Sequence, residues 1–577
     1  MVKTVLKKIN SLKNYFSNLE IFIICILLLV FISSRLILLG NHFVHYDDLY
    51  SPYILKLVNS YDQKNFLDFI ERNLFQFDDS VYVYLLNFFK NYDWVFSILK
   101  FLLSPFVVGK TSTFAPLQFY LTEIFIFIET NLSNSLFLLR LPSLIFSVLS
   151  IITIFLISKK LKTNHYFSLI IPLFVFCFSW MYLVYTAQAS SFASIIFCFL
   201  CTILIYLHIS ERNITKRKSI LLGFLFTILF LINYQVLFLI PAFYIGLIIS
   251  FRFSPSAILS NLFYFALVNL SLVLLIYFLF LQERLSWNPG VHWNAGRNQE
   301  YLFVGECGYT NLICFIIFFK ENILTVLKAI LSFTEISSIT SNLYLIFLLL
   351  LSTTGFFYLL YMKKNIFYFF LLCLITWLFL IYFQKVTLSP SRHSLYLVVI
   401  ISYLSVYGVI FLSNFNSFVA KIIFNSLLIL FLCLYIFNYN QNYYERINHL
   451  NFKINLEELI LKYDPYIIIS TGHSTEFEFS YLSKKYNSKF INESPFYFVY
   501  QKKTKESNNT ILTFCSSSEE CSKVDSFSTI NLIYKSLPSK KNIKLIYSYE
   551  HESNITNCYS NIVGSGYNSL YLGVWEY

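Results

Sequence analysis

"SILLGFLFTILFLINYQVLFLIPAFYIGLIISF", residues 219–251, is an apolar stretch that contains no charged side chain. A single helix of this length would be about 50 Å long, whereas the hydrocarbon core of a bilayer is about 30 Å thick. The stretch also holds polar and helix-breaking residues near its centre. We therefore predict two short membrane helices, hinged near Asn233–Pro241.

The composition extends this prediction to the whole chain. Of the 577 residues, 57% are hydrophobic and only 13% are charged, about half the charged fraction of a soluble protein. A formal net charge of +12 would suit nucleic acid, but the Lys and Arg residues lie largely in short loops between apolar runs, as membrane topology requires. We expect a lipid bilayer as a partner and no nucleic acid.

Apolar runs long enough to cross a bilayer recur through the first three quarters of the chain. They are 21–40, 136–158, 166–185, 188–209, 219–251, 257–281, 341–361, 366–384, 394–413 and 418–437. The segments 94–109 and 117–130 are marginal because they contain charged residues or proline. The expected fold is an all-α polytopic bundle of about 11–13 transmembrane helices.

Basic clusters orient these helices, because Lys and Arg favour the cytoplasmic side. The N-terminus has four lysines before its first acid, Glu20, and is predicted to be cytoplasmic. The later clusters also fall inside if 117–130 is re-entrant or forms a hairpin with 94–109. The loops 41–115 and 283–340 and the C-terminus then lie outside. The first run is a signal anchor rather than a cleavable signal peptide.

The last part of the chain changes character. Long apolar runs stop after the transmembrane module 1–438, and short β-like stretches follow at 466–470, 496–501, 511–515, 543–549 and 570–577. A helical pattern at 455–463 precedes them. Residues 439–577 are predicted to form a small extracytoplasmic α/β domain. Its Cys515, Cys521 and Cys558 either include one disulfide or remain free thiols.

An acidic pair, Asp47–Asp48, follows the first apolar run and has tyrosines on both sides, including Tyr50. Helix capping is the plain interpretation. The outer loop that follows is too long for a simple connector and has amphipathic segments at 51–61 and 66–75, suited to lying along the membrane interface. A carboxylate at this place is a candidate general base.

Cations at predicted outer helix ends are candidate phosphate ligands. Arg140 lies beside a proline at the start of 136–158, and Arg392 and His393 open 394–413. Cations kept on a side that disfavours them commonly meet an anion, and Arg offers a planar fork for phosphate. Snorkelling to the interface is the alternative for Arg140, and His393 could be an ordinary interface residue.

Three further segments supply candidate substrate-binding residues. Tyr120 lies in the proline-led segment 113–130, and Gln188 lies in the outer turn "YTAQASSF". The outer loop stretch "RLSWNPGVHWNAGRNQEYLF", residues 284–303, contains His292 and Arg297. Tight helix packing explains the turn equally well, and an aromatic belt explains the tryptophans of the loop without any substrate.

The order of these segments resembles a known family. The acidic pair, "PLQFY" at 116–120, "LRLPSLIFSVLS" at 139–150, "YTAQASSF" at 185–192 and "SRHSLYL" at 391–397 are similar to the pattern of integral-membrane glycosyltransferases that use lipid-phosphate sugars. These are the protein O-mannosyltransferases and the aminoarabinose transferases of lipid A, glycosyltransferase family 39. The resemblance covers the first 240 residues and the region 385–400. Asn233–Tyr234 and Gln188 depart from the residues that family members often have there.

The resemblance implies a C-type glycosyltransferase fold in the bacterial inner membrane, with the active site on the periplasmic side. It implies Asp47 and Asp48 as the catalytic pair and places Arg140 and Arg392 near the phosphate of a polyprenyl-phosphate sugar. The expected reaction is inverting transfer of the sugar to an acceptor hydroxyl of a glycan, lipid or protein. Some relatives use a divalent metal. This chain has no clear third carboxylate, so we expect no metal site and leave a divalent metal open.

Two other functions remain open from the sequence. A transporter or flippase of lipid-linked glycans would need charges in mid-span and broken helices in both halves of the bundle. The sequence has one clear break, at 233–241, and its charges lie near the predicted outer boundary. A polysaccharide polymerase or ligase is closer to the expected chemistry and harder to separate from it.

Overall fold

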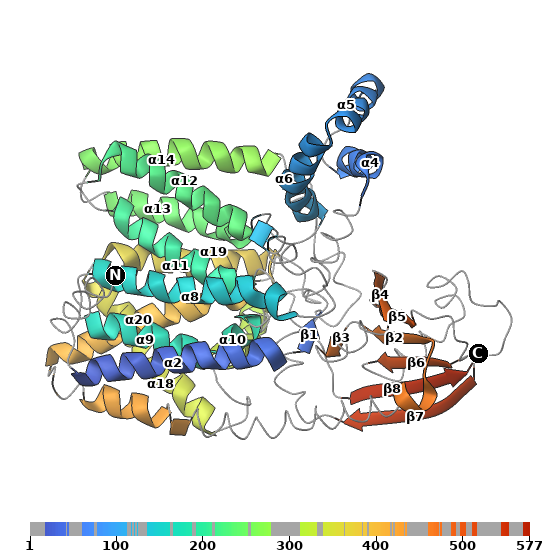
Figure 1. Cartoon of the computed structure of the whole chain (residues 1–577). Coiled ribbons are helices and arrows are strands. Elements are labelled where there is room, and N and C mark those ends of the chain that lie inside the picture. Colours follow the sequence, from blue (N-terminus) through green and yellow to red (C-terminus); the bar gives the residue numbers. More distant parts are fainter. Residues whose placement is uncertain are drawn as a thin grey trace.

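A computed structural model gives the structure of the chain (Figure 1). It describes residues 18–41, 43–45, 61–73, 78–111, 117, 120–121, 124, 136–161, 165–186, 192–210, 214–251, 255–278, 312–331, 339–362, 364–383, 385–388, 392–415, 418, 422–431, 433–434, 460–471, 473–475, 486–491, 497–502, 510–515, 544–552 and 569–576. Asp47, Asp48, Tyr50, Gln188, His292 and Arg297 lie outside these residues, as does the predicted boundary between 438 and 439.

Most of the described chain forms a helical bundle. Its helices are α2 (Asn18–Asn41), α8 (Leu136–Leu161), α9 (His165–Phe178), α10 (Trp180–Thr186), α11 (Phe192–Ile209), α12 (Lys216–Ile232), α13 (Leu239–Phe251), α14 (Pro255–Ile276), α17 (Leu312–Leu331), α18 (Ile339–Tyr361), α19 (Asn365–Tyr382) and α20 (Tyr396–Phe415). Within the described residues, five helices are long and apolar enough to cross a membrane: Arg140–Leu161, Phe192–Ile209, Asn342–Tyr361, Asn365–Tyr382 and Tyr396–Asn414. This confirms the prediction of an α-helical membrane bundle.

The bundle has two chemically different ends. Lys159 and Lys160 occupy the last turn of α8, and Lys364 directly precedes α19. The hydroxyl of Tyr206, near the end of α11, donates to the carbonyl of Asn365 over 3.0 Å, so these helix termini lie at one end. We call it the basic end. The opposite end, which faces the β-sheet in Figure 1, is the sheet end.

The apolar stretch 219–251 is broken as predicted. Helix α12 ends at Ile232, a 3₁₀ turn η1 spans Tyr234–Phe238, and α13 follows. The break is at Asn233. Its side chain accepts a hydrogen bond from the backbone N–H of Gln235 over 3.0 Å and donates one to Ser194 Oγ of α11 over 3.0 Å. The side chain therefore replaces helical hydrogen bonds where the chain turns. Pro241 lies inside α13 and not at the hinge.

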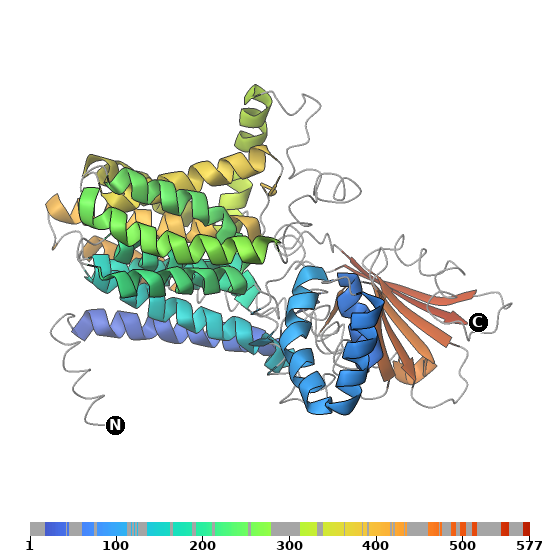
Figure 2. The same ribbon diagram turned by 90° about the horizontal axis from the view of Figure 1, so that it is seen from above.

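Three helices lie beside the sheet end and run across the direction of the bundle helices (Figures 1 and 2). They are α4 (Gln63–Asn73), α5 (Asp79–Asn91) and α6 (Asp93–Thr111). Phe66 of α4 packs edge-on against Phe96 of α6, with ring centroids 5.6 Å apart. Tyr82 of α5 donates to Asp68 of α4, and this hydrogen bond, with burial, raises the pKa of Tyr82 to about 12.

The marginal segment 94–109 therefore belongs to α6, and α4 covers most of the amphipathic segment predicted at 66–75. The amphipathic segment 51–61 lies outside the described residues, apart from Tyr61. Of 117–130, only four residues are described. The Tyr120 ring packs on Phe101 of α6 at 5.9 Å, and its hydroxyl donates to the Leu102 carbonyl. These contacts fit the predicted pairing of 117–130 with 94–109.

A six-stranded sheet follows the bundle in the chain, with strand order β4-β5-β2-β6-β8-β7. The strands are β2 (Ile467–Thr471), β4 (Tyr486–Ile491), β5 (Tyr497–Lys502), β6 (Thr510–Cys515), β7 (Lys544–Glu552) and β8 (Ser569–Glu576). Among these described strands, β2 and β6 pair in parallel and the other neighbours pair antiparallel. Five of these strands coincide with the β-like stretches in the sequence, whereas β4 had no such signal. Of the predicted helix 455–463, the described residues 460–463 are helical.

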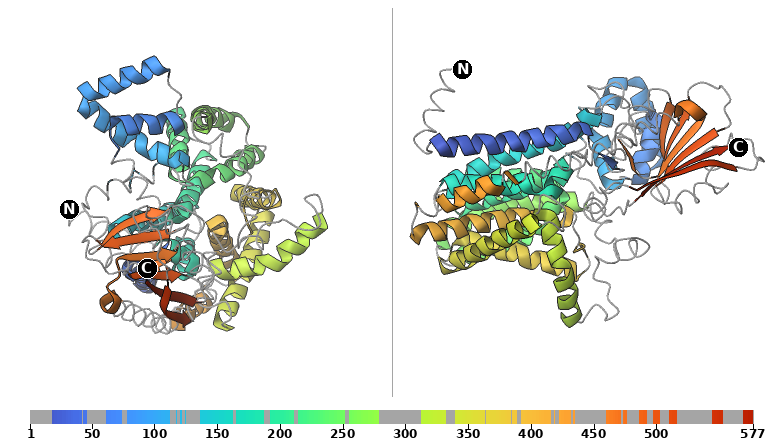
Figure 3. Two further views of the ribbon diagram at one scale, coloured as in Figure 1. Left: turned by 90° about the vertical axis from the view of Figure 1, so that its right-hand side faces the viewer. Right: turned by 90° about the horizontal axis from the view of Figure 1, so that it is seen from below.

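A second, two-stranded sheet connects the segment after the first helix to the C-terminal region. Strand β1 (Phe43–His45) begins just after α2, and it pairs antiparallel with β3 (His473–Thr475), which lies just after β2. Val44 is the register partner of Ser474. Figure 3 shows the large sheet and α4–α6 at the same end of the bundle. Strand β1 therefore ties the start of the first loop to the C-terminal region.

Candidate functional site

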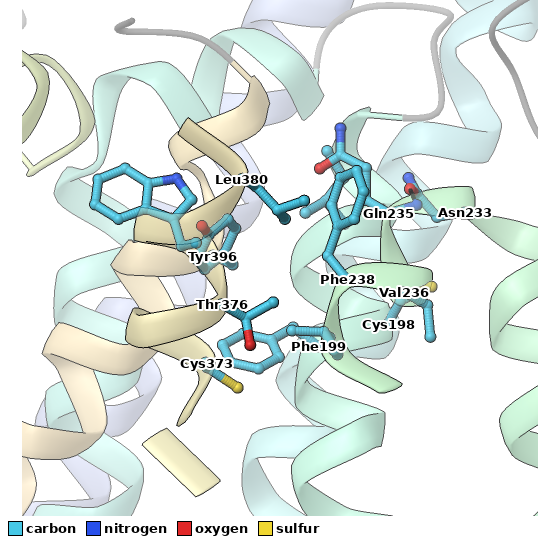
Figure 4. Close-up of a pocket in the computed structure, with 13 residues that line it drawn as sticks. Cys198, Phe199, Asn233, Gln235, Val236, Phe238, Cys373, Thr376, Leu380 and Tyr396 are labelled. Atoms are coloured by element: carbon cyan, nitrogen blue, oxygen red, sulfur yellow. Dashed lines mark hydrogen bonds between the residues drawn. The ribbon is translucent and has the colours of Figure 1, made fainter. Parts of the chain in front are cut away.

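A pocket lies in the half of the bundle nearer the sheet end (Figure 4). Its cavity volume is about 20 Å³, enough for about one water molecule. Helices α11, α13, α19 and α20 and the break around η1 form its walls. Most of the lining is apolar or weakly polar: Ile195, Cys198, Phe199, Val236, Phe238, Leu239, Cys373, Leu380 and Tyr396. These walls offer contacts to apolar groups, and the space between them is small.

The broken helix supplies polar groups at one side of the pocket. The Asn233 side chain is held by hydrogen bonds to Ser194 Oγ and to the backbone N–H of Gln235. It is therefore a fixed part of the pocket wall. In Figure 4 the side-chain amide of Gln235 lies at the upper edge of the cavity. Helix α11 begins at the sheet end with Phe192. Phe199 lies below Gln235 in Figure 4 and is further along α11, so the edge with Gln235 is the one nearer the sheet end.

Trp377 lines the opposite wall and is 3% exposed. Its ring is fixed between two others, edge-on to Phe319 at 6.2 Å and to Tyr396 at 6.0 Å. The indole Nε1 is buried and has no hydrogen-bond acceptor among the described residues. Because an indole N–H can only donate, this wall offers one unused donor in apolar surroundings.

Cations lie in the connection that follows α19 and leads into α20. Lys385 is exposed, and its backbone N–H donates to the carbonyl of Leu380, a lining residue, over 2.8 Å. Arg392 and His393 begin the 3₁₀ turn η4 (Arg392–Ser394), which leads directly to Tyr396. The backbone of Arg392 is described, but its side chain is outside the described residues. In the sequence, Lys385 lies five residues after Leu380, and Arg392 and His393 lie four and three residues before Tyr396.

Arg140 is placed elsewhere. It is fully buried near the start of α8, and no residue of α8 lines the pocket. Helix α8 packs on the side of α11 that carries Phe197, through the rings of Phe146 and Phe197 at 5.5 Å. The neighbouring residues Cys198 and Phe199 face the pocket. Arg140 and Arg392 are thus both at the sheet end but on different sides of α11.

A second buried arginine, Arg35, was not among the residues that the sequence singled out. Arg35 of α2 is fully buried and donates to the carbonyls of Phe31 and Phe176, each over 3.1 Å. Its guanidinium lies 3.4 Å from the centre of the Phe31 ring and 5.0 Å from that of Tyr182. The sequence feature that could have pointed to it is an arginine near the end of the first apolar run, 21–40. These contacts make Arg35 a link between α2 and α9–α10.

The remaining predicted residues are placed only in part. Strand β1 ends two residues before Asp47, and α10 ends two residues before Gln188, so both segments leave described elements at the sheet end. Tyr120 packs on α6, and its role in substrate binding stays a prediction. The same holds for Tyr50, His292 and Arg297. Among the described residues no group of three or more His, Cys, Asp or Glu could hold a metal ion.

Sequence reasoning missed most of the pocket. The polar interruption Asn233–Tyr234–Gln235 was visible and marked the broken wall. Trp377 and Cys373 lie in an ordinary apolar run, and nothing in their spacing separates a pocket wall from a packed core. No protein-family model and no curated protein matches this chain.

Proposed function

We propose that this protein is an inverting glycosyltransferase of the bacterial inner membrane. It moves a sugar from a polyprenyl-phosphate donor to an acceptor hydroxyl on the periplasmic side. The observation that carries the proposal is the apolar pocket in the outer half of the bundle, with Lys385, Arg392 and His393 next to its lining. Apolar side chains followed in the chain by cations would suit contact with a lipid that has an anionic head.

The topology supports this proposal. The basic end would face the cytoplasm, which puts the pocket mouth, the sheet and α4–α6 on the outer side. Cys314, near the start of α17, is disulfide-bonded, and such bonds persist in oxidising compartments such as the periplasm. An outer sheet above a helical bundle is also compatible with the C-type glycosyltransferase fold that the sequence resembles.

The chemistry assigns a role to each group. Asp47 would take the proton from the acceptor hydroxyl, with Asp48 orienting the acceptor or acting in its place. The acceptor oxygen forms a bond to the anomeric carbon while the bond from that carbon to the phosphate oxygen breaks. Arg392 would stabilise the polyprenyl phosphate as it leaves. Arg140 lies on another side of α11 from the pocket, so its expected role at the phosphate rests on the resemblance alone. Attack from the face opposite the phosphate inverts the anomeric centre.

A transporter of lipid-linked glycans is the second candidate, favoured by a buried polar face on α8. This face carries Arg140, Ser143, Ser147 and Ser150 and could outline a path through the bundle. However, Ser147 and Ser150 donate to carbonyls four residues earlier in the same helix, over 2.9 and 2.8 Å. Serines satisfied in this way pack helices and do not require a solvated path.

Sugar transfer in membranes tests the proposal directly. Membranes carrying the wild type, Asp47→Asn or Asp48→Asn are supplied with radiolabelled polyprenyl-phosphate sugars, and label in the acceptor fraction is measured. Removing the base should slow transfer about 10²–10⁴-fold while the protein still inserts and folds. Asp78→Asn is the matched control, because Asp78 is an exposed residue of the same predicted loop and should retain wild-type rates. Full transfer by both Asp47→Asn and Asp48→Asn would remove the pair from catalysis.

A wild-type protein that releases labelled lipid to the other leaflet without any glycosylated product would instead identify a transporter. A polymerase is distinguished by the product, because repeated transfer gives a ladder of lengths and single transfer gives one species.

A further inference from the structure

We infer that α5 and α6 form a membrane-contacting arm, whose exposed apolar faces lie in the head-group region of the bilayer at the sheet end of the bundle. The arm comprises residues 79–111. The inference goes beyond the proposed function, because it concerns how the protein contacts lipid and holds for any reaction that the bundle supports.

Helix α5 carries an exposed apolar face. Val81, Tyr84 and Tyr92, the residue after α5, are exposed, and Tyr84 is 68% exposed. Phe88 lies between the two tyrosines, with ring centroids 6.3 Å from Tyr84 and 4.9 Å from Tyr92. Positions three and four apart fall on one side of a helix, so these residues form one continuous strip. Asn87 is exposed on a different, polar side of α5.

Helix α6 carries a similar face. Trp94 is 66% exposed, and Ile98 and Leu102 follow it at intervals of four residues and are also exposed. Tyr92 and Trp94 lie two residues apart at the junction of the two helices. Tyr and Trp favour the head-group level of a bilayer, because their rings combine an apolar body with a polar group.

Helix α4 buries its apolar side within the protein. Phe66, Leu67 and Ile70 are at most 4% exposed, and Phe66 packs on Phe96 of α6. The amphipathic segment 66–75 suited the membrane interface by its sequence, but the apolar side of its described part is the core between α4, α5 and α6. The surface that remains for lipid lies on α5 and α6.

The place of the arm supports lipid as its partner. Helix α13 ends at the basic end, where the hydroxyls of Ser250 and Tyr206 are hydrogen-bonded over 3.0 Å, so α14 runs towards the sheet end. Its last turn and the residues after it expose Leu274, Leu275 and Phe278. Figures 1 and 3 show α6 beside this end of α14, and α5 extends past the outline of the bundle. The exposed apolar surface of the bundle thus continues onto the arm.

The charges of the arm favour an apolar attachment. Residues 79–111 contain three lysines and two aspartates, so attraction to anionic lipids contributes little. Its exposed faces instead combine aliphatic side chains with Tyr and Trp, and the strength of such an attachment follows the buried apolar area. We therefore expect the arm to contact neutral lipids as well as anionic ones.

Photo-crosslinking of the full-length protein in nanodiscs tests the arm. The photoreactive residue p-benzoylphenylalanine is placed at Trp94 or Tyr84 in a bilayer of dioleoyl phosphatidylcholine, and intact-mass spectrometry measures the fraction of protein that gains a lipid. Both positions should form lipid adducts as readily as Phe278 on the bundle surface. Asn87 is the matched control, because it is exposed on the polar side of the same helix, and its adducts should fall to background.

Lipid adducts at Phe278 but not at Trp94 or Tyr84 would overturn the inference. A crosslinked protein dimer in their place would also overturn it and would identify a second copy of the chain as the partner. Adding dioleoyl phosphatidylglycerol to the bilayer should leave the yields unchanged. Adducts that require this anionic lipid would contradict the apolar attachment.

Hydrogen exchange provides a second measurement, without substitutions. Backbone amides of α5 should exchange more slowly in nanodiscs than in bilayer-free peptidiscs, because lipid covers one side of the helix. Amides of α4, whose apolar side is buried in both, should exchange alike. Equal exchange of α5 in the two preparations would overturn the inference. Neither measurement involves sugar transfer, so a protein that transfers no sugar can still have a membrane-contacting arm.

Discussion

Arg35 illustrates at the residue scale how a guanidinium is accommodated inside the bundle. Its planar head donates to two carbonyls, of Phe31 on its own helix and of Phe176 on α9, and it stacks on the Phe31 ring. Arginine suits this role because its charge is delocalised and its donors are spread in a plane. The residue joins α2 to α9 close to the point where α9 ends.

We predict that Arg35→Lys destabilises the protein more than Arg35→Met. The lysine must still bury a charge, but one ammonium cannot satisfy both carbonyls and stack on the ring, so we expect a loss of about 1–2 kcal/mol. The methionine removes both the charge and its desolvation cost. Thermal or denaturant unfolding in one detergent measures the difference.

The matched control is Ser33→Ala, because the Ser33 hydroxyl donates only within α2, to the Val30 carbonyl, and its loss should change little. A greater loss for Arg35→Met than for Arg35→Lys would contradict this account and indicate that the positive charge itself is required, as it would be for binding an anion.

At the scale of elements, two glycines allow the backbones of α18 and α20 to pack in close contact. A Cβ on Gly355 of α18 would lie 1.8 Å from the Leu404 carbonyl oxygen, and one on Gly408 of α20 would lie 2.1 Å from the Leu351 carbonyl oxygen. Backbones approach this closely only where side chains are absent. The crossing fixes α20, whose first residue lines the pocket.

We expect Gly355→Ala and Gly408→Ala to lower stability by about 1–3 kcal/mol each, as overpacked cores do. Gly223→Ala, with a Cβ 2.7 Å from the Phe265 carbonyl oxygen, should have a smaller effect. Gly246→Ala should be mildest, because its nearest atom, the flexible Tyr206 hydroxyl, is 3.3 Å away. Unfolding midpoints of the four variants should follow this order, and an equal loss in all four would show that close backbone contact is not the cause.

The elements were largely predictable from the sequence, whereas the site was predictable only in part. Long apolar runs gave the helices, and β-branched and aromatic runs gave five strands, because both signals are local. The break at Asn233 was visible for the same reason. The pocket was not, since Trp377 and Cys373 acquire their role only when α19 packs against distant helices. Strand β4, with its mixed sequence, is likewise defined by its pairing with β5.

At the scale of the whole molecule, β1 and β3 connect the first loop to the C-terminal region. We predict that Val44→Cys combined with Ser474→Cys forms a disulfide under mild oxidation, because these residues are register partners and directly opposed Cα atoms in antiparallel strands lie about 4.5–5.5 Å apart. Mass spectrometry of the digested protein without reduction identifies the linked peptides.

The control pair is Val44→Cys with Lys544→Cys, since Lys544 begins the edge strand β7 and is not a partner of β1. This pair should remain unlinked. Equal linkage of both pairs, or none in the first, would contradict the strand pairing and leave the C-terminal sheet free of the first loop.

The pairing of β1 with β3 also orders events during synthesis. Val44 leaves the ribosome roughly 430 residues before its partner Ser474, which at about 5–20 residues per second corresponds to about 20–90 s. A truncated or frameshifted chain that ends before His473 never supplies that partner. In such a chain β1 would keep an unpaired backbone edge, which is a ready template for pairing with another strand.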